Sequence, residues 1–339
     1  MCKLFLRLLL LLLVRVGFGA EQLVWHEEFN GSKLNTTYWT PEINFVRNVE
    51  AVQIYTNRPK NLMLRGGHLI LTAHNEYFES TNWKPESKHW WESRKAANYT
   101  SGSINSKGKL QFRYGRVEIR AKIEHGRGVW PALWLIGDNP GGWPSCGEID
   151  ILEFVSQNPK TVHATLHYTK NGKYTHPTNP YQAKKAIAGD WHIYGMNWTP
   201  EKLELTFDGD VIFTHQLDQA TQNDGKNPFR DGVYHFIINL ALDGWAEAPV
   251  AADYPRAFTV DYVRLYQDCA VEGTTLLING ETPSTKTTQR ATNQKVKHKT
   301  TPRKKKKEKS RTQRFIIDTS KMDKKEKHGT ERIQPDSRL

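Results

Sequence analysis

The sequence lacks several features that would point to other classes of protein. It has 3 cysteines and 4 methionines among 339 residues, and it contains no internal repeat. No long segment combines a helical period of apolar residues with capping residues. The one long apolar run lies within residues 1–20 and is too short to cross a bilayer. We therefore expect neither a helical fold nor a membrane anchor.

A basic central domain is also missing, although the whole chain carries a formal net charge of +12. Residues 1–20 contribute three basic and no acidic residues, and residues 270–339 contribute 19 Lys and Arg against 8 Asp and Glu. These two segments account for +14, which leaves −2 for residues 21–269. Nucleic-acid binding by the central part loses its main electrostatic support, so we expect no nucleic-acid partner.

The two ends of the chain have compositions of their own. Residues 1–20 join a basic start, the apolar run Leu8–Val14 and a small-residue exit, which is typical of a secretory signal peptide. Residues 270–339 are basic and poor in apolar residues, which favours a disordered tail that could contact acidic matrix polysaccharide. Residues 21–269 are then the folded domain of a secreted, extracellular protein.

Secretion gives a meaning to two further patterns. Cys2 would leave with the signal peptide, so Cys146 and Cys269 could form one disulfide bond or remain two thiols. Triplets that accept N-linked glycans begin at Asn30, Asn35, Asn98 and Asn197. The last of these falls in a strand-like run and is the least favoured acceptor.

The central part contains many short segments in which apolar and polar residues alternate. Clear examples are His68–Ala73, Tyr114–Ile123, Lys202–Phe207 and Thr259–Tyr266. Turn residues such as Gly-Gly, Asn-Gly and Asp-Gly separate these segments. Many evenly spaced strands in one domain predict an all-β fold, a β-sandwich or jelly roll.

The segment WPSCGEIDILEF, residues 143–154, concentrates acidic side chains in a strand-like context. Glu148 and Asp150 point to the same side of a strand, whereas Glu153 would point to the other. A β-bulge near residues 151–152 would return Glu153 to the acidic side. The two glutamate carboxyl groups could then approach the roughly 5–5.5 Å separation of a retaining glycosidase.

Three close carboxyl groups cannot all ionise at neutral pH, so at least one pKa must rise. A neutral acid can then protonate a glycosidic oxygen while an ionised neighbour attacks the anomeric carbon. Trp130, Trp134 and Trp143 lie just upstream and offer flat platforms for sugar rings. For the acids alone, a solvated strand face and a hard-cation site are the alternatives.

The segment GEIDILEF resembles the E-x-D-x-x-E signature of glycoside hydrolase family 16, in its laminarinase-like group of endo-β-1,3-glucanases and β-1,3-glucan-binding proteins. Other family strands resemble LVWHEEFNG, TSGSINSKGKLQFRYGRVEIRAKI, WPALWLIG, VHATLHY, FIINLALDGW and VDYVRLYQ, in this order along the chain. The resemblance implies a curved β-sandwich jelly roll with a substrate cleft on its concave face. It implies no required cofactor, and a structural calcium ion is compatible with it.

Carried over residue by residue, the pattern makes Glu148 the nucleophile, Asp150 the assisting acid and Glu153 the general acid/base. The same pattern implies a second set of residues that contact the sugar chain. These are Trp130, Trp134, His167, Asn239 and Trp245. Each of them could instead be an ordinary packing residue.

The sequence departs from the family pattern at three places. Ser103 stands where the family often has Arg, Asn197 stands where it usually has Glu, and the segment around Glu50–Gln53 is longer by one residue. The catalytic trio is intact, so these differences concern how the sugar chain is held.

The leading hypothesis is a secreted hydrolase that cleaves internal β-1,3-glucosidic bonds of laminarin-type β-glucans by double displacement. The alternatives are a non-catalytic β-1,3-glucan recognition protein of innate immunity and a transglycosylase of the same family. The residues alone leave open whether mixed-linkage glucan is also a substrate.

Overall fold

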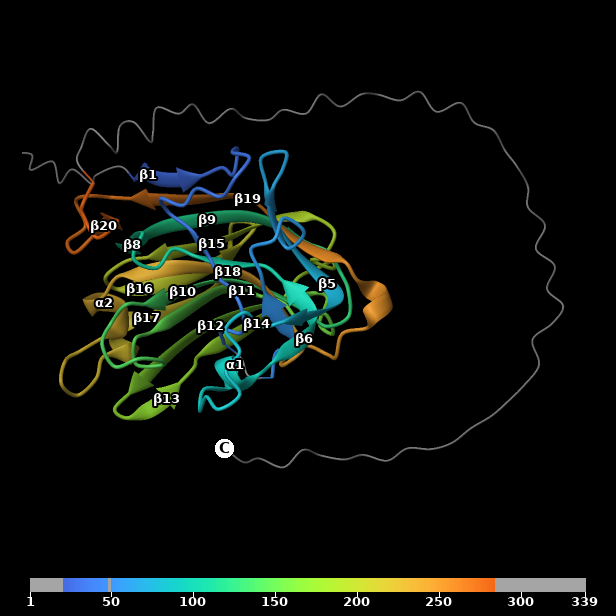
Figure 1. Ribbon diagram of the computed structural model, residues 1–339. Coiled ribbons are helices and arrows are strands. Elements are labelled where there is room, and N and C mark those ends of the chain that lie inside the picture. Colours follow the sequence, from blue (N-terminus) through green and yellow to red (C-terminus); the bar gives the residue numbers. More distant parts are fainter. Residues whose placement is uncertain (1–20, 48–49, 284–339) are drawn as a thin grey trace, which may run out of the picture. The chain divides into compact units, whose positions relative to one another are not determined.

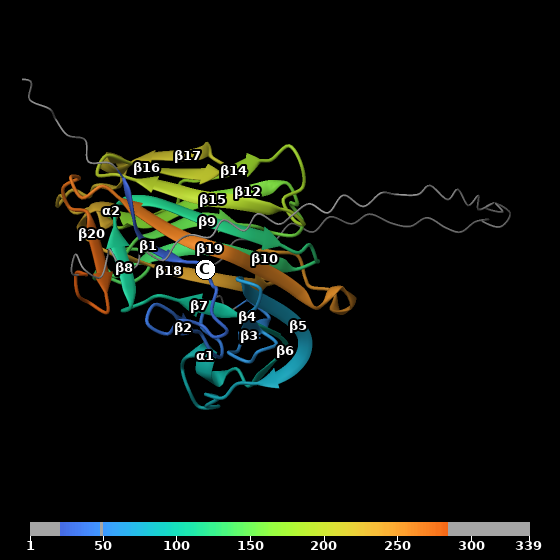
Figure 2. The ribbon, with the colours of Figure 1, turned by 90° about the horizontal axis from the view of Figure 1, so that it is seen from above.

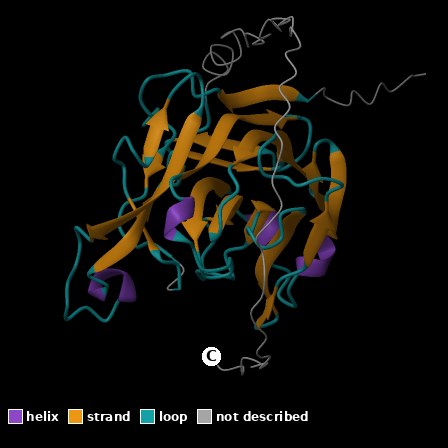
Figure 3. Ribbon diagram, turned by 90° about the vertical axis from the view of Figure 1, so that its right-hand side faces the viewer, coloured by secondary structure: helices purple, strands orange, loops and turns teal. Residues whose placement is uncertain are grey.

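The computed structural model describes residues 21–47 and 50–283 (Figure 1). The predicted signal peptide and most of the predicted tail lie outside these residues. Strands dominate the described part, and its few helices are single turns (Figure 3). The helical turns are α1 (Trp90–Ser93), α2 (Pro228–Asp231) and the 3-10 turns Leu217–Ala220 and Ala251–Asp253. The prediction of an all-β fold is confirmed.

The strands form two sheets that stack as a sandwich (Figures 1 and 2). The first sheet has ten strands, and eight of them follow the order β17 (Asp210–Gln216), β16 (Lys202–Phe207), β15 (Trp191–Trp198), β9 (Gly115–Ile123), β19 (Arg256–Gln267), β5 (Leu69–Glu79), β6 (Ala96–Ser101) and β3 (Gln53–Tyr55). Its other two strands are β1 (Gln22–Glu27), paired with β19, and β4 (Leu62–Leu64), paired with β5.

The second sheet also has ten strands and carries the acidic segment. Seven of them follow the order β13 (Lys173–Thr175), β12 (Thr161–Lys170), β11 (Glu148–Glu153), β10 (Val129–Gly137), β18 (Tyr234–Leu242), β7 (Ser103–Asn105) and β2 (Thr40–Pro41). The remaining three are β14 (Thr178–Gln182) on β12, β8 (Leu110–Arg113) on β18, and β20 (Thr275–Ile278) on β8. The four alternating segments singled out in the sequence all fall on strands of the first sheet.

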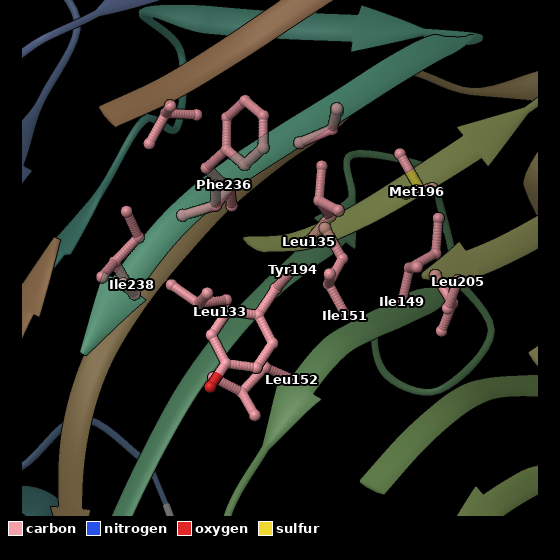
Figure 4. Packing of buried hydrophobic residues seen from close by; sticks show 14 of the residues in the cluster. Leu133, Leu135, Ile149, Ile151, Leu152, Tyr194, Met196, Leu205, Phe236 and Ile238 are labelled. Carbon is pink, nitrogen blue, oxygen red and sulfur yellow. The ribbon is translucent and has the colours of Figure 1, made fainter. Parts of the chain in front are cut away.

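The core lies between the sheets and is built by strand alternation. Every second residue of β9, from Val117 to Ile123, is buried, and its neighbours are half-exposed. Figure 4 shows how the two sheets meet in the core. The side chains labelled there come from β10, β11 and β18 on one side and from β15 and β16 on the other: Leu133, Leu135, Ile149, Ile151, Leu152, Phe236, Ile238, Tyr194, Met196 and Leu205.

A β-bulge in β11 decides which side chains leave the core. The pairing of β11 with both β10 and β12 shifts register after Asp150, as the sequence predicted. Ile151 and Leu152 are consecutive, yet both are fully buried in the core. Each contributes about 1.5–3 kcal/mol by leaving water. Because both fill the core, Glu153 points to the face that already carries Glu148 and Asp150; we call it the outer face of the second sheet.

The structure answers one question that the sequence left open, the state of the cysteines, and shows that the predicted domain end at residue 269 is wrong. Cys146 and Cys269 are both free thiols: Cys146 is buried just before β11 in the second sheet, whereas Cys269 is exposed after β19 of the first. The folded part also extends past residue 269. Residues 275–278 form β20, which pairs with β8 and buries Leu276 against the core.

Three of the four expected glycan acceptors have the exposure that a glycan requires. Asn30, Asn35 and Asn98 are exposed, whereas Asn197 is half-buried within β15. Their glycosylation stays a prediction. Within the described residues, no helix combines the length and apolar character needed to cross a membrane.

Gly147 fixes the backbone immediately before Glu148, and its replacement should be costly. Its φ is +82°, and an added Cβ would lie 2.0 Å from the Tyr234 hydroxyl. Gly172 also has a positive φ, of +78°, but an added Cβ there meets no atom within 4 Å. We expect Gly172→Ala to lower the free energy of unfolding by about 1 kcal/mol and Gly147→Ala by about 2–4 kcal/mol, measured by urea denaturation. Equal losses in the two variants would contradict the steric role of Tyr234.

Candidate active site

The acidic residues of β11 stand in cross-strand rows on the outer face of the second sheet. Glu148 pairs with His167 of β12 and Ile136 of β10, and Asp150 pairs with Thr165 and Trp134 in the same way. Glu153 pairs with His163 on one side and Ala132 on the other. Strand pairing therefore brings the predicted catalytic trio together with Trp134 and His167.

Aromatic groups surround Glu148. The indole N–H of Trp143 donates a hydrogen bond of 2.7 Å to Glu148 Oε2, and His167 Nε2 lies 4.0 Å from Glu148 Oε1. Tyr174 of β13 stacks on the His167 ring and lies 5.4 Å, centroid to centroid, from Trp143. Trp143 and Tyr174 are 56% and 49% exposed, so they form an aromatic wall that a ligand can reach.

His167 connects this wall to the middle acid. Its Nε2 lies 3.0 Å from Asp150 Oδ2, and its Nδ1 lies 2.5 Å from the hydroxyl of Tyr174. When the Tyr174 hydroxyl donates a hydrogen bond to Nδ1, the proton of the neutral imidazole must be on Nε2, where it faces Asp150. Tyr174 therefore sets the tautomer of His167 in this arrangement.

A second aromatic group stands at the Glu153 end of the acidic segment. The indole N–H of Trp130 donates a hydrogen bond of 3.1 Å to Glu153 Oε1. Trp245 packs edge-on against both Trp130 and His163, with centroid distances of 5.9 Å and 4.5 Å, and remains 43% exposed. Burial lowers the pKa of His163, which favours its neutral form beside Glu153.

Trp134 lies deeper than a simple stacking platform. It is 9% exposed, and its indole N–H donates a hydrogen bond of 2.7 Å to Asn239 Oδ1. Asn239 in turn donates to the hydroxyl of Tyr55 at 3.2 Å. The guanidinium of Arg47 lies 5.0 Å from the Trp134 ring centroid.

Arg47 is itself held by a polar group at the edge of the sheet. It forms a two-pronged ion pair with Glu42 and donates to Ser103 Oγ at 3.0 Å. This ion pair keeps the pKa of the buried Glu42 carboxyl below its usual value, although burial alone would raise it. A guanidinium thus stands next to Ser103, although it comes from a distant segment of the chain.

Burial dominates the electrostatics of the acidic trio. It raises the pKa of Glu148 to about 8, that of Glu153 to about 7, and that of Asp150 well above its usual range. Repulsion between the carboxylates adds to the rise, whereas the tryptophan N–H donors and His167 oppose it. The direction of these shifts agrees with the expectation that at least one pKa of the trio rises. Glu148 has the higher of the two pKa values, whereas a nucleophile should have the lower one. The order of the pKa values therefore does not support the assignment of the two roles.

The other sequence-predicted residues lie around the same trio, and several partners were not predicted. Trp130, His167 and the pair Trp134–Asn239 contact an acid or each other, and Trp245 lines the Glu153 end. The residues missed are Tyr55, Arg47, His163 and Tyr174. Only Tyr174 has a sequence signal, because the Asn171-Gly172 turn returns its strand against the His167 strand.

One group of side chains in the described part has the composition and spacing of a cation site. Glu148, Asp150 and His167 place one ligand-type atom each within 4.8 Å of one another. These are members of the acidic site itself, and the glycosidase chemistry expected of them requires no metal. The compatibility with a structural calcium ion stays a prediction.

A jelly-roll sandwich that presents paired carboxyl groups between tryptophans defines the class of β-sandwich glycoside hydrolases. Residues 50–263 match the sequence profile of Glycosyl hydrolases family 16, and the chain belongs to this family. The resemblance drawn from GEIDILEF is thereby confirmed.

Named relatives extend this result. Glucan endo-1,3-beta-glucosidase A1 of Niallia circulans is 32% identical over 74% of the chain, which spans 39% of that protein. A structure solved for endo-acting O-glycanases of human gut bacteria that initiate mucin breakdown is 37% identical, with a TM-score of 0.71, and the match covers 74% of this chain and 91% of that one. The laminarinase catalytic domain of Thermotoga maritima is 29% identical, with a TM-score of 0.61 and coverage of 73% and 98%.

The raised pKa values predict how stability depends on pH. The folded protein keeps protons on these acids between about pH 4.5 and 8, where the unfolded chain has released them, so stability falls as pH rises through this window. Glu148→Gln removes one such acid. We expect its melting temperature to exceed that of the wild type by more at pH 8 than at pH 4.5, with about 2–4 °C for each kcal/mol.

The exposed Glu272 provides the matched control. The melting temperature of Glu272→Gln should differ between pH 4.5 and pH 8 by as much as that of the wild type. A Glu148→Gln shift that is equal at both pH values would show that burial does not hold a proton on the trio.

The contact between Tyr174 and His167 predicts a positioning effect. Tyr174→Phe keeps the ring stack but removes the hydroxyl that reaches His167 Nδ1. Losing one such hydrogen bond should lower kcat by about three- to tenfold and alter the pH profile of kcat, with KM nearly unchanged. Nitrogen NMR shifts of the imidazole would report the tautomer directly.

Tyr266→Phe, in the first sheet, removes a hydroxyl that contacts Glu118 at 3.4 Å and serves as the control. A Tyr174→Phe variant with wild-type kcat, pH profile and imidazole shifts would leave Tyr174 with only a packing role.

Proposed function

We propose that the protein is a secreted endo-β-1,3-glucanase that cleaves β-glucan with retention of configuration. The observation that carries this proposal is the face of β11, where Glu148 and Glu153 each accept an indole N–H and have Asp150 between them. Retaining glycosidases require two carboxyl groups on opposite sides of the scissile bond, of which one must be protonated. The trio meets the second requirement because burial holds a proton on it.

The first step forms a glycosyl-enzyme. Glu153 donates its proton to the glycosidic oxygen, the bond between that oxygen and the anomeric carbon breaks, and Glu148 attacks the anomeric carbon. Trp130 occupies Oε1 of Glu153, which leaves Oε2 to carry the proton. The leaving sugar departs with the donated hydrogen as a free hydroxyl group.

The second step releases the product. Glu153, now ionised, removes a proton from water, and the hydroxide oxygen attacks the anomeric carbon as its bond to Glu148 breaks. This restores protonated Glu153 and ionised Glu148. The Trp143 N–H and His167 lie beside Glu148, where they stabilise the negative charge of the free nucleophile. Asp150 can assist the ionised Glu148 only as the protonated partner of the pair, because a carboxylate has no hydrogen to donate.

The substrate assignment has three supports. The central part of the chain has a net charge near zero, and exposed aromatic side chains flank the acidic trio, as a neutral polysaccharide requires. The family pattern in GEIDILEF belongs to the laminarinase-like group, and similar proteins carry the names glucan endo-1,3-beta-glucosidase and laminarinase. Secretion is proposed from the composition of residues 1–20, and contact of the basic tail with acidic matrix polysaccharide from its charge.

A second candidate is an endo-acting glycanase on mucin O-glycans. It is favoured by the 37% identity and the TM-score of 0.71 to a structure described for mucin-degrading O-glycanases. The acid chemistry would be the same, and only the sugars on either side of the scissile bond would differ. A recognition protein without activity is disfavoured because both glutamates are present, and a transglycosylase would differ only in the acceptor used in the second step.

The decisive measurement is the release of reducing ends from soluble β-1,3-glucan by purified residues 21–283. We expect hydrolysis by the wild type and a loss of at least about 10³-fold in kcat for Glu148→Gln, because the nucleophile is gone. Mucin O-glycans and mixed-linkage glucan tested in parallel separate the substrate classes. Product lengths separate hydrolysis from transfer.

Glu148→Ala with added azide provides the control for the role of Glu148. Azide can occupy the vacated position and should restore part of the activity with an inverted glycosyl azide as product. Activity on O-glycans but not on β-glucan would replace the proposed substrate, and glucan binding without any cleavage by the wild type would exclude the enzyme.

A further inference from the structure

Exposed apolar side chains gather in two places in the described part of the chain. Trp143, Tyr174 and Trp245 flank the acidic trio, as described above. All but one of the other strongly exposed large hydrophobic residues lie near the end of β5, on the connection between β5 and β6, or on the segment on which that connection packs: Ile43, Val46, Tyr77, Trp83 and Trp91. Single exposed apolar residues are ordinary, whereas a group of them marks an interaction surface.

The connection between β5 and β6 is a long loop with an internal structure of its own. It covers residues 80–95 and contains α1 (Figure 2). The backbone N–H of Lys84 donates to the carbonyl oxygen of Glu92 at 2.7 Å, and the Lys84 ammonium donates to the Glu92 carboxylate at 2.8 Å. Ser87 donates to the same carboxylate at 2.6 Å. Trp83 and Trp91 each directly precede one member of this pairing, so both indoles are carried by the part of the loop that these bonds fix.

The two neighbouring tryptophans of α1 have different surroundings. Trp90 packs against Phe45, with ring centroids 6.3 Å apart, and anchors the loop. Trp91 stacks on His89 at 4.5 Å and stays 37% exposed. Trp83 has the Lys95 ammonium 5.1 Å from its ring centroid and stays 42% exposed. Each exposed indole is thus supported from within the loop and offers apolar surface to the solvent.

The loop is fastened to the segment that leads into the acidic site. Thr81 donates its backbone N–H to Asn44 Oδ1 at 2.9 Å, and the Arg94 guanidinium donates to the carbonyl oxygen of Ala51 at 2.8 Å. Between these two anchor points lies Arg47, which stands over Trp134. The segment that carries exposed Ile43 and Val46 therefore joins the loop to the residues beside Trp134.

We propose that the loop formed by residues 80–95 is a second carbohydrate-binding platform, on which Trp83 and Trp91 hold a distal stretch of the polysaccharide that the acidic trio cleaves. This inference rests on the proposed function and specifies its substrate as a long chain. Rigid indoles bind the apolar faces of sugar rings at a low cost in conformational entropy. The two lysines nearest the indoles, Lys84 and Lys95, are each paired with a carboxylate, Glu92 and Glu79, so the platform suits a neutral polysaccharide.

The test compares a long substrate with a short one in the double variant Trp83→Ala/Trp91→Ala. We expect kcat/KM on soluble long-chain β-1,3-glucan to fall by about three- to tenfold, the equivalent of one or two lost stacking contacts. On a short β-1,3-gluco-oligosaccharide, which cannot reach the loop, kcat/KM should equal that of the wild type. Val211→Ala, which removes an exposed apolar side chain from β17, is the matched control and should change neither value.

Binding is measured separately in the Glu148→Gln background, where the polysaccharide is not degraded. The Glu148→Gln variant should be retained on an insoluble β-1,3-glucan column. The triple variant that also carries Trp83→Ala and Trp91→Ala should elute earlier. Unchanged retention together with an unchanged ratio of the two kcat/KM values would overturn the inference. An equal loss on long and short substrates would also overturn it, because the loop would then only support the acidic site.

Two other outcomes are distinguishable from these. If the double variant converts a dimer into a monomer in sedimentation experiments and handles the polysaccharide as before, the surface is a contact between copies of the chain, and the inference is wrong. If the wild type does not cleave even the short oligosaccharide, the proposed function is wrong, and the inference that rests on it is wrong as well. Wild-type cleavage of the short substrate with no effect of the loop overturns the inference alone.

Discussion

The site depends on one irregularity in strand pairing, the bulge that buries Ile151 and Leu152 side by side. A regular strand would place Glu153 among the core side chains, where an acid without a partner costs several kcal/mol. Burying two consecutive apolar residues moves the following acid to the outer face instead. The hydrophobic core therefore determines the geometry of the acids, and the acids contribute nothing to the core.

Desolvation is the second constraint, and it gives the carboxyl groups their reactivity. The trio lies largely within protein. Among the described residues, two indole N–H groups, one imidazole and the distant guanidinium of Arg47 stabilise its charges. These donors are too few for three carboxylates. A retained proton is the consequence, and a proton held near neutral pH is what a general acid needs. The aromatic side chains thus exclude water from the acids in addition to offering surface to a sugar.

The sequence contained enough information for the fold and the acids but not for their surroundings. Alternation of apolar and polar residues predicted strands such as Lys202–Phe207 with their exact ends. The bulge was predictable because a regular strand would place Glu148 and Glu153 on opposite sides of the sheet. Tyr55 and Arg47 could not be predicted, because they reach Asn239 and Trp134 from segments far away in the chain. The state of Cys146 and Cys269 could not be decided for a related reason: two cysteines in a sequence carry no information on whether they belong to the same sheet. The end of the domain was misplaced because four residues of β20 are too few to produce a periodic signal.

The separation of the acids from the core has a consequence for how this scaffold can evolve. The catalytic site places three carboxyl groups, Glu148, Asp150 and Glu153, where burial disfavours their ionised forms. Their ionisation therefore lowers the stability of the fold. A lineage released from selection for hydrolysis would gain stability by replacing them, while Ile149, Ile151 and Leu152 kept the sheet and its aromatic walls in place. Selection for robustness alone would then turn a hydrolase of this build into a lectin, with no change of fold and no new surface.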